Sequence, residues 1–152
     1  MVQTAKTVCI VGLGYVGLPL ACLCAEKGYT TIGYDINQDA VSKLRIGITV
    51  IKEDDLQYKV SLLKDKIHYT TDSKDIAKAD IVIICVPTPV DDKHMPDLVP
   101  VISASRTVNA NLKPGTLVIL ESTIHPGTCE EIVLPLFDPK ICGKDFYLAH
   151  CP

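Results

Sequence analysis

The segment Gly12-Leu13-Gly14-Tyr15-Val16-Gly17 has the spacing G-x-G-x-x-G, which is typical of loops that bind phosphate groups. We expect Gly12 to permit a tight turn, Gly14 to let backbone amides approach a pyrophosphate, and Gly17 to let a helix pack closely on a strand. The N-terminus of that helix would offer free N–H groups to the anion. The alternative is a plain structural turn without a ligand, which requires only the conformational freedom of glycine.

An acidic residue follows the glycine motif at about the 20-residue distance expected for dinucleotide binding. This residue, Asp35, closes a predicted strand. A carboxylate there can accept hydrogen bonds from both hydroxyls of an adenine ribose, whereas it would repel the 2′-phosphate of NADP. The pattern therefore predicts NAD as the cofactor. The alternative is that Asp35, with Ile36 and Asn37 after it, only caps the next helix.

Two further loops, residues 86–89 and 121–128, follow predicted strands and are expected at the same edge of the sheet. In an open α/β sheet the ligand lies beyond the carboxyl ends of the strands, where the strand order reverses. Thr88 can present a hydroxyl to a ribose or phosphate, while Ser122 and Thr123 can serve the nicotinamide side or orient a water molecule. The alternative for all three is the turn and capping chemistry that Ser and Thr routinely supply.

These motifs lie in an alternation of short apolar runs and helix-period segments, which is typical of βαβ units. We predict a doubly wound, Rossmann-type α/β fold with three layers and a parallel sheet of six strands in the order 3-2-1-4-5-6. The predicted strands cover residues 7–11, 30–35, 67–70, 80–86, 116–120 and 146–150. The predicted helices cover residues 15–27, 38–45, 53–64, 73–78, 97–112 and 126–136, with Ser73 and Asp97 as caps. Pro19 conflicts with the first helix and should bend or loosen it.

The composition indicates one ordinary folded domain covering residues 1–152. The chain is 47% hydrophobic and 22% charged, close to the averages for soluble domains, and its length permits a real core. A net charge of −3 offers no basic surface for nucleic acid. No apolar stretch approaches the roughly 20 residues of a membrane span, and no signal-peptide pattern opens the chain. We therefore expect neither a nucleic-acid nor a membrane partner.

The seven cysteines are scattered and odd in number, as is typical of reduced thiols in the cytoplasm. The one close pair, Cys22 and Cys24, lies in a helical pattern that points the two side chains to different faces. No histidine lies at metal-ligand spacing from another, so we expect no metal site.

Several segments together resemble the UDP-glucose/GDP-mannose dehydrogenase family along the whole chain. They are residues 11–19, Val-Pro-Thr-Pro at 86–89, Glu-Ser-Thr at 121–123, Pro-Gly-Thr at 126–128 and Ala-His-Cys-Pro at 149–152. Residues 35–41 and the loop 87–97 look most like the UDP-N-acetyl-D-mannosamine dehydrogenases of that family. Ala40 departs from the many relatives with a basic residue near the adenosine, which implies weaker cofactor binding.

The resemblance implies oxidation of the C6 alcohol of a UDP-sugar to a carboxylate with two NAD⁺, through a covalent adduct on a cysteine. It implies a cytoplasmic, homo-oligomeric enzyme of polysaccharide biosynthesis. Cofactor contacts carry over to the glycine loop, Asp35, Thr88 and Thr123, and Thr123 is also implied in orienting the catalytic water. The resemblance implies that the cysteine nucleophile, the catalytic lysine and asparagine, a helical domain and a C-terminal domain all lie beyond Pro152. We therefore expect this chain alone to bind NAD without oxidising a sugar nucleotide.

Alternative functions remain open at this point. The sugar could be that of UDP-glucose. An NAD-sensing regulatory domain would share the glycine loop and the acidic residue, but it has no need for the loops at 86–89 and 121–123. A dehydrogenase of small hydroxy acids would share the cofactor fold without predicting His-Cys-Pro at 150–152.

Overall fold

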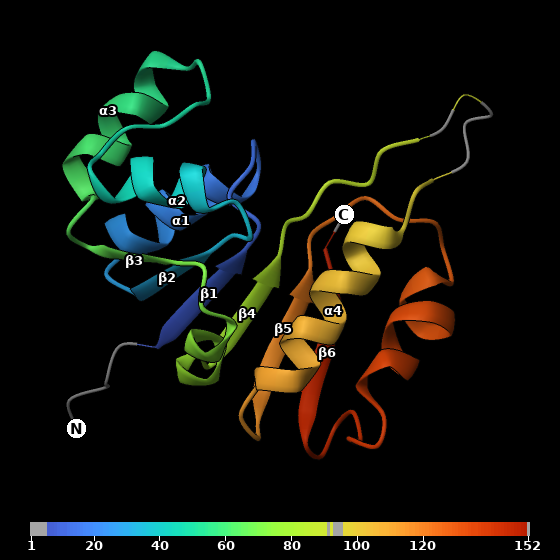
Figure 1. The fold of residues 1–152 in the computed structure, drawn as a ribbon. Helices are drawn as coiled ribbons and strands as arrows, with labels where there is room; N and C mark the ends of the chain where they lie inside the picture. Colours follow the sequence, from blue (N-terminus) through green and yellow to red (C-terminus); the bar gives the residue numbers. More distant parts are fainter. Residues whose placement is uncertain (1–5, 91, 93–95, 152) are drawn as a thin grey trace, which may run out of the picture.

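One parallel sheet forms the centre of the molecule. The computed structural model describes residues 6–90, 92 and 96–151. Six strands lie in the order β3-β2-β1-β4-β5-β6, which confirms the predicted topology (Figure 1). They are β1 (Thr7–Val11), β2 (Thr30–Tyr34), β3 (Ile67–Thr70), β4 (Ile81–Ile84), β5 (Thr116–Leu120) and β6 (Phe146–His150). Because β1 lies between β2 and β4, the order reverses at the β1–β4 pair.

Helices pack on both faces of the sheet, as predicted. One hydrophobic core joins the sheet to α1 (Gly17–Glu26), α2 (Gln38–Arg45) and α3 (Asp54–Leu63). The second core joins it to α4 (Val99–Asn111) and to three short turns, η1 (Ser73–Lys78), η2 (Cys129–Val133) and η3 (Leu134–Phe137). Figure 1 shows α1–α3 gathered beside β1–β3, and α4 with the segment that follows β5 beside β4–β6.

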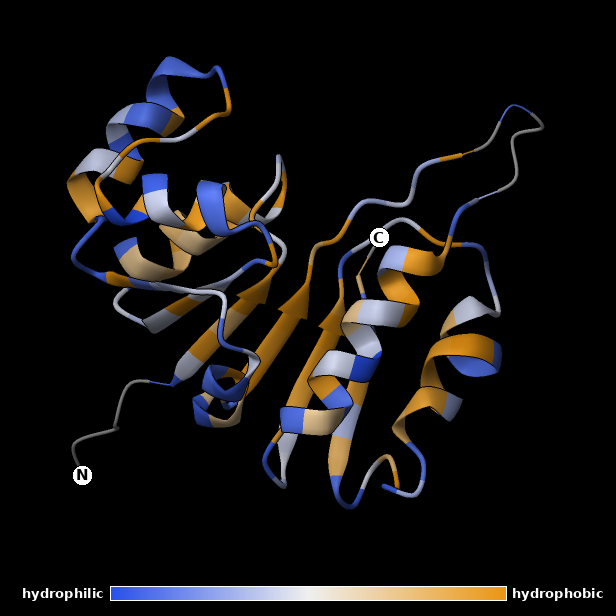
Figure 2. Cartoon of the chain, in the orientation of Figure 1, coloured by the Kyte–Doolittle hydropathy of each residue, from blue (hydrophilic) through white to orange (hydrophobic). Residues whose placement is uncertain are grey.

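The central strand β1 separates the two cores. Its side chains alternate between them, with Val8 and Ile10 in one core and Cys9 and Val11 in the other, and all four are buried. Strands β4 and β5 are almost wholly hydrophobic (Figure 2). Buried and half-buried residues alternate along both strands, so the face toward α4 is the more deeply buried one. The apolar run predicted at β1 is thus explained by helices on both of its faces.

The first helix, which Pro19 is expected to bend or loosen, is continuous through this residue. Helix α1 begins at Gly17 rather than at Tyr15, so Pro19 is the third residue of its first turn. The Leu18 N–H donates to Gly14 O at 3.1 Å and the Leu20 N–H donates to Val16 O at 3.3 Å, so helical hydrogen bonds form on both sides of the proline. Pro19 has no N–H and therefore lacks one bond of this turn, without ending the helix.

Two other predicted helix starts differ in their caps. Asp72, not Ser73, caps η1, because its Oδ1 accepts a hydrogen bond of 2.9 Å from the Lys74 N–H. Asp97 Oδ1 accepts one of 2.9 Å from the Val99 N–H and so supports the start of α4 from two residues before it. Both aspartates accept from the N–H two residues further along the chain, as aspartate side chains commonly do in turns that precede a helix.

The α-helix predicted for residues 126–136 is also wrong. The chain there forms a π-helical turn, η2, followed by the 3₁₀ turn η3, which begins with Leu134 and Pro135. Proline cannot donate the hydrogen bond that would continue a regular helix across this junction. Phe137 of η3 stacks on Phe146 of β6 with ring centroids 4.7 Å apart, so the irregular segment is still fixed to the sheet. Strand β4 is shorter than predicted, and β2 ends one residue before Asp35.

Candidate functional site

The carboxyl ends of four neighbouring strands lie at one edge of the sheet. Hydrogen bonds of sheet type continue past the strands and hold the following loops together there. The Gly12 N–H donates to Tyr34 O at 2.8 Å, the Cys85 N–H to Val11 O at 2.8 Å, and the Glu121 N–H to Ile84 O at 2.9 Å. The loops after β1, β2, β4 and β5 therefore border the point where the strand order reverses, as expected for the ligand site of such a sheet.

The glycine loop has a different steric requirement at each glycine. Gly12 has a φ of +93°, which side chains rarely adopt. A Cβ on Gly17 would lie 1.8 Å from Gly12 O, so only glycine lets α1 approach the end of β1 so closely. A Cβ on Gly14 would meet no atom within 4 Å, because this residue faces open space. That space is left free for a ligand.

Backbone donors are available at the start of α1. No hydrogen bond within the described residues uses the N–H groups of residues 14–17. Leu13 differs, since its N–H donates to Asp35 and its side chain is buried in the core. The first turn of α1 contains no acidic residue that would repel an anion. Free donors and the positive end of the helix dipole together suit a pyrophosphate.

Asp35 lies beside the glycine loop rather than at the cap of α2. Its Oδ2 accepts a hydrogen bond of 2.7 Å from the Leu13 N–H, and its Oδ1 accepts one of 2.8 Å from the Asn37 N–H. Asn37 is the N-cap of α2, because its side chain accepts from the Ala40 N–H at 3.0 Å. The alternative that Asp35 only caps the helix is therefore wrong. Each carboxylate oxygen keeps lone pairs for a further donor.

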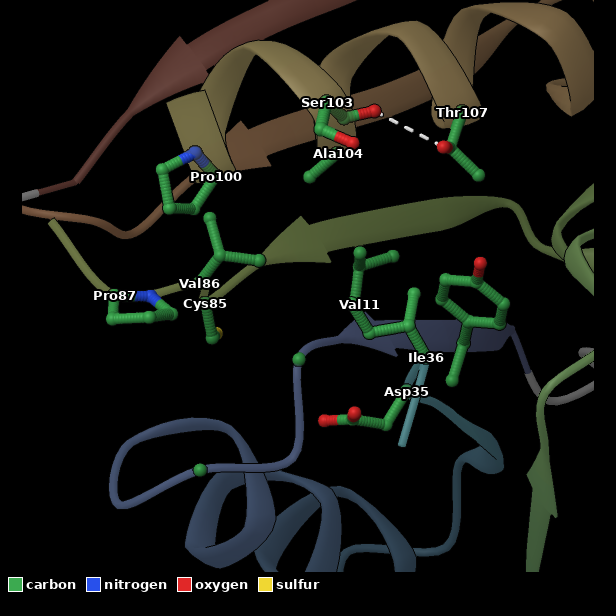
Figure 3. Close-up of a pocket in the computed structure, with 13 residues that line it drawn as sticks. Val11, Asp35, Ile36, Cys85, Val86, Pro87, Pro100, Ser103, Ala104 and Thr107 are labelled. Carbon is green, nitrogen blue, oxygen red and sulfur yellow. Dashed lines mark hydrogen bonds between the residues drawn. The ribbon is translucent and has the colours of Figure 1, made fainter. Parts of the chain in front are cut away.

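The first of two cavities at this edge lies between Asp35 and helix α4. It has a volume of about 370 Å³ and is walled mainly by apolar groups. In Figure 3 the Asp35 carboxylate points toward the glycine loop, with Val86, Pro87 and Pro100 around the cavity. On α4 the Thr107 hydroxyl donates a hydrogen bond of 3.0 Å to the Ser103 carbonyl (Figure 3). An apolar slot with a carboxylate at its mouth suits an adenine and its ribose.

The second cavity lies on the other side of Gly14 and also has a volume of about 370 Å³. It shares four lining residues with the first, namely Gly14, Cys85, Val86 and Pro87. Its other walls come from the glycine loop and from the loops after β4 and β5, through Tyr15, Val16, Thr88, Glu121, Ser122 and Thr123. The structure thus brings the predicted residues Thr88, Ser122 and Thr123 together. Gly17 and Leu13 line neither cavity, so both support the loop from behind.

Ser122 connects two of the loops that form the second cavity. The side chain is buried, and its Oγ donates a hydrogen bond of 2.7 Å to the Val86 carbonyl. Thr123 beside it is exposed, and Thr88 is half-buried across the cavity. Ser122 is thereby placed to fix the distance between the two threonines, while Thr123 is free to contact a ligand.

Comparison with known proteins agrees with this geometry. Residues 6–152 match the sequence profile of the NAD-binding domain of the UDP-glucose/GDP-mannose dehydrogenase family. The chain belongs to this family. The alternatives of an NAD-sensing regulatory domain and of a small hydroxy-acid dehydrogenase are therefore set aside.

Relatives within the family act on different sugars according to their names. A UDP-N-acetyl-D-mannosamine dehydrogenase of Methanococcus aeolicus is 40% identical over 150 residues, covering 95% of this chain and 33% of that protein. A UDP-N-acetyl-D-glucosamine 6-dehydrogenase of Pseudomonas aeruginosa is 39% identical over 151 residues, covering 95% and 34%. The solved UDP-N-acetyl-mannosamine dehydrogenase of Staphylococcus aureus superposes with a TM-score of 0.87 at 36% identity, covering 97% of this chain and 36% of that chain. The chain spans about a third of the length of these relatives.

The NAD of the family fits the residues present. Two cavities that meet at the side-chain-free Gly14 can accept the two halves of a dinucleotide, with the pyrophosphate between them at the free N–H groups of residues 14–17. Asp35, which lines the first cavity, suits the ribose hydroxyls of NAD. Ala40, where the sequence departs from many relatives, lines neither cavity.

Sequence reasoning missed the contribution of helix α4. Pro100, Ser103, Ala104 and Thr107 face the first cavity, yet none belongs to a motif. Their spacing of three and four residues places them on one helix face, and that face could have been found by asking which side of the helix after β4 looks toward the strand reversal. Cys85 and Ile36 were also missed, because both read as ordinary hydrophobic residues.

Among the cysteines in the described residues, Cys85 lines both of these cavities. The exposed Cys142 borders a separate hollow beside η3. Burial, with a smaller contribution from the Glu121 carboxylate, raises the pKa of Cys85 to about 12. The thiol is therefore protonated at neutral pH and a poor nucleophile. Over residues 6–90, 92 and 96–151, no cluster of side chains suited to a metal ion occurs, and no helix has the length and apolar character of a membrane span.

Proposed function

We propose that this chain is the NAD-binding part of a nucleotide-sugar 6-dehydrogenase that oxidises the C6 alcohol of UDP-N-acetyl-D-mannosamine to the uronic acid with two NAD⁺. The observation that carries the proposal is the pair of cavities joined at Gly14, with Asp35 at one end and Thr88 and Thr123 at the other. The sugar is taken from the relatives named UDP-N-acetyl-D-mannosamine dehydrogenase, to which the chain is up to 40% identical. The other catalytic and sugar-binding groups would lie outside residues 1–152.

The residues of the chain would divide the work along the dinucleotide. The cofactor supplies a hydride acceptor when it is bound. Asp35 would hold the adenine ribose, Gly12 to Gly17 the pyrophosphate, and Thr88 the nicotinamide ribose or a phosphate. Ser122 would position the loops, and the exposed Thr123 hydroxyl would contact the nicotinamide side and orient the catalytic water. Tyr15 and Val16, both exposed on the glycine loop, would cover the nicotinamide end.

We further propose the cellular setting of such an enzyme. Seven cysteines without a disulfide suit the reducing cytoplasm. A uronic acid attached to UDP is an activated building block, which suits polysaccharide biosynthesis. The complete protein would act as a homo-oligomer, with no nucleic-acid or membrane partner.

The test measures NADH formation by the natural protein that carries this chain. UDP-N-acetyl-D-mannosamine, UDP-N-acetyl-D-glucosamine, UDP-glucose and GDP-mannose are compared, and two NADH per molecule of UDP-N-acetyl-D-mannosamine are expected. Thr123→Ala should lower kcat more than it raises KM for NAD⁺, with Thr30→Ala, an exposed threonine at the start of β2 that lines neither cavity, as the matched control. Preference for another sugar nucleotide would overturn the proposed substrate. NAD binding without oxidation of any of the four sugar nucleotides would overturn the proposed dehydrogenase activity.

A further inference from the structure

A carboxylate in the second cavity has no role in the function described so far. Glu121 follows β5 directly, and its backbone is fixed by the N–H bond of 2.9 Å to Ile84 O. Its side chain is half-buried and lines the second cavity. None of the hydrogen bonds or ion pairs found within the described residues involves its carboxylate. A carboxylate with no partner among the described residues interacts with whatever the cavity beside it holds.

The charge of Glu121 reaches the junction of the two cavities. Cys85 lies at that junction, and Glu121 is the largest charged contributor, after burial, to the raised pKa of the Cys85 thiol. The carboxylate therefore acts on the interior of the cavity and not only on the solvent outside. Low-dielectric walls strengthen such an interaction relative to water.

The orientation of the dinucleotide follows from Asp35. With the adenine ribose at Asp35 in the first cavity, the nicotinamide ring occupies the second, beside Glu121. This step rests on the proposed function. The nicotinamide ring carries a positive charge in NAD⁺ and none in NADH, while the rest of the two molecules is the same.

We propose that the Glu121 carboxylate makes this site prefer NAD⁺ over NADH. The oxidised ring gains a favourable interaction with the carboxylate, and the reduced ring does not. Such a preference retains the substrate form of the cofactor and favours release of the product form after hydride transfer. Release is needed before the second NAD⁺ can enter.

The experiment measures the dissociation constants of NAD⁺ and NADH for the 152-residue chain and for Glu121→Gln. Titration calorimetry serves for NAD⁺, and NADH fluorescence serves for NADH. We expect Glu121→Gln to weaken NAD⁺ binding about fivefold and to change NADH binding less than about twofold, on the scale of one partly screened charge pair. A fivefold change in the ratio of the NAD⁺ and NADH dissociation constants corresponds to about 20 mV in the midpoint potential of the bound two-electron couple.

Three further variants make the result specific. Glu121→Asp keeps the negative charge and should keep the preference for NAD⁺. Glu121→Ser removes the charge, and it serves in place of Glu121→Gln if the glutamine variant does not fold. Glu130→Gln removes an exposed carboxylate outside both cavities and should leave the ratio unchanged.

The possible failures are distinguishable. An unchanged NAD⁺ to NADH ratio in folded neutral variants overturns the role of Glu121 while the proposed function stands. A loss of affinity that is equal for both forms also overturns it, because it indicates a structural effect. If the unaltered chain binds neither form, both the proposed function and this inference are overturned.

Discussion

At the scale of single residues, Asp35 combines a structural and a binding role. Its carboxylate accepts from Leu13 N–H at 2.7 Å and from Asn37 N–H at 2.8 Å, and so joins the glycine loop to the segment that follows β2. The same charge faces the first cavity. A substitution at this position is therefore expected to change cofactor selection and loop geometry together.

Asp35→Ala should weaken NAD binding by about 1–3 kcal/mol, because hydrogen bonds to a charged acceptor are lost. It should also narrow the preference for NAD over NADP, since the repulsion of the 2′-phosphate disappears. Calorimetric titration with both cofactors measures the two effects, and Asp39→Ala, an exposed carboxylate in the first turn of α2, is the control. Equal affinities of the unaltered chain for NAD and NADP would contradict the ribose assignment.

Ser122→Ala should lower the free energy of unfolding by about 1–3 kcal/mol, because it leaves the Val86 carbonyl without its buried donor. NAD affinity should fall as well, since the loops after β4 and β5 lose the bond between them. Urea unfolding and NAD titration check the two effects. Ser61→Ala, at an exposed serine of α3, should change neither. A Ser122→Ala variant with normal stability would show that the bond of 2.7 Å contributes little.

At the scale of elements, one glycine of the glycine loop is needed for folding and another for cofactor binding. Gly17→Ala should destabilise the chain by about 3 kcal/mol, since the new Cβ cannot fit against Gly12 O and α1 must move. Gly14→Ala should leave the free energy of unfolding within about 0.5 kcal/mol, because its Cβ meets no atom. It should nevertheless weaken NAD binding at least about tenfold, since the methyl group enters the space for the pyrophosphate.

Chemical denaturation and NAD titration of both variants test this contrast. A Gly14→Ala chain that binds NAD normally would show that the space between the two cavities is not used by the cofactor. A Gly17→Ala chain of normal stability would contradict the close approach of α1 to β1.

The element η1 is fixed to β3 through Asp75. Burial raises the pKa of Asp75, but hydrogen bonds from Lys78, His68 and Thr70 outweigh burial and hold this pKa well below its usual range. The Oδ2 of Asp75 lies 2.9 Å from His68 Nε2. Because the pKa is lowered in the folded state, the contribution to stability is complete above the unfolded pKa of about 3.9 and is lost as the pH falls from there through the folded pKa.

Asp75→Asn should therefore be less stable than the unaltered chain at pH 7, and this difference should shrink as the pH falls below about 4. Urea unfolding at a series of pH values measures it. Asp72→Asn, which caps η1 from an exposed position, serves as the control for the helix start. A difference that stays constant down to pH 2 would contradict the role of the ionised Asp75.

At the scale of the whole molecule, the chain has a cofactor site but no activated thiol beside it. Cys85 alone among the described cysteines lines the two central cavities, and burial raises its pKa to about 12. Cys151 is exposed, and its N–H donates to Leu120 O at 3.0 Å, but it borders neither cavity. The thiolate that covalent catalysis requires is thus missing from the site.

The chain by itself should bind NAD⁺ and form no NADH with UDP-N-acetyl-D-mannosamine or UDP-glucose. Absorbance at the NADH maximum follows the reaction, and calorimetry confirms that the same sample binds NAD⁺. Steady NADH formation that disappears on replacing Cys142 or Cys151 would show that a nucleophile lies within these residues.

The sequence by itself determined the order of the strands, the glycine loop and the loop residues Asp35, Thr88, Ser122 and Thr123 that line the two cavities. Local physics suffices for these features, because apolar periodicity selects strands and helices, and right-handed crossovers leave few ways to connect them. Gly12 and Gly17 are recognisable because no other residue type meets their steric requirements, and Gly14 is recognisable from the G-x-G-x-x-G spacing. Asp35 is recognised as a candidate ribose-binding residue from its position at the end of a predicted strand.

Only the tertiary structure decided which partners these residues meet. The sequence does not show that Asn37 rather than Asp35 caps α2, that Ser122 binds the Val86 carbonyl, or that Thr107 faces the first cavity. Each depends on contacts between segments far apart in the chain or on competition among neighbouring side chains for one N–H group. The packing of α4 and the turns η2 and η3 against the sheet likewise overrode the regular helix predicted after β5, because a proline and the stacking of Phe137 on Phe146 favour an irregular path.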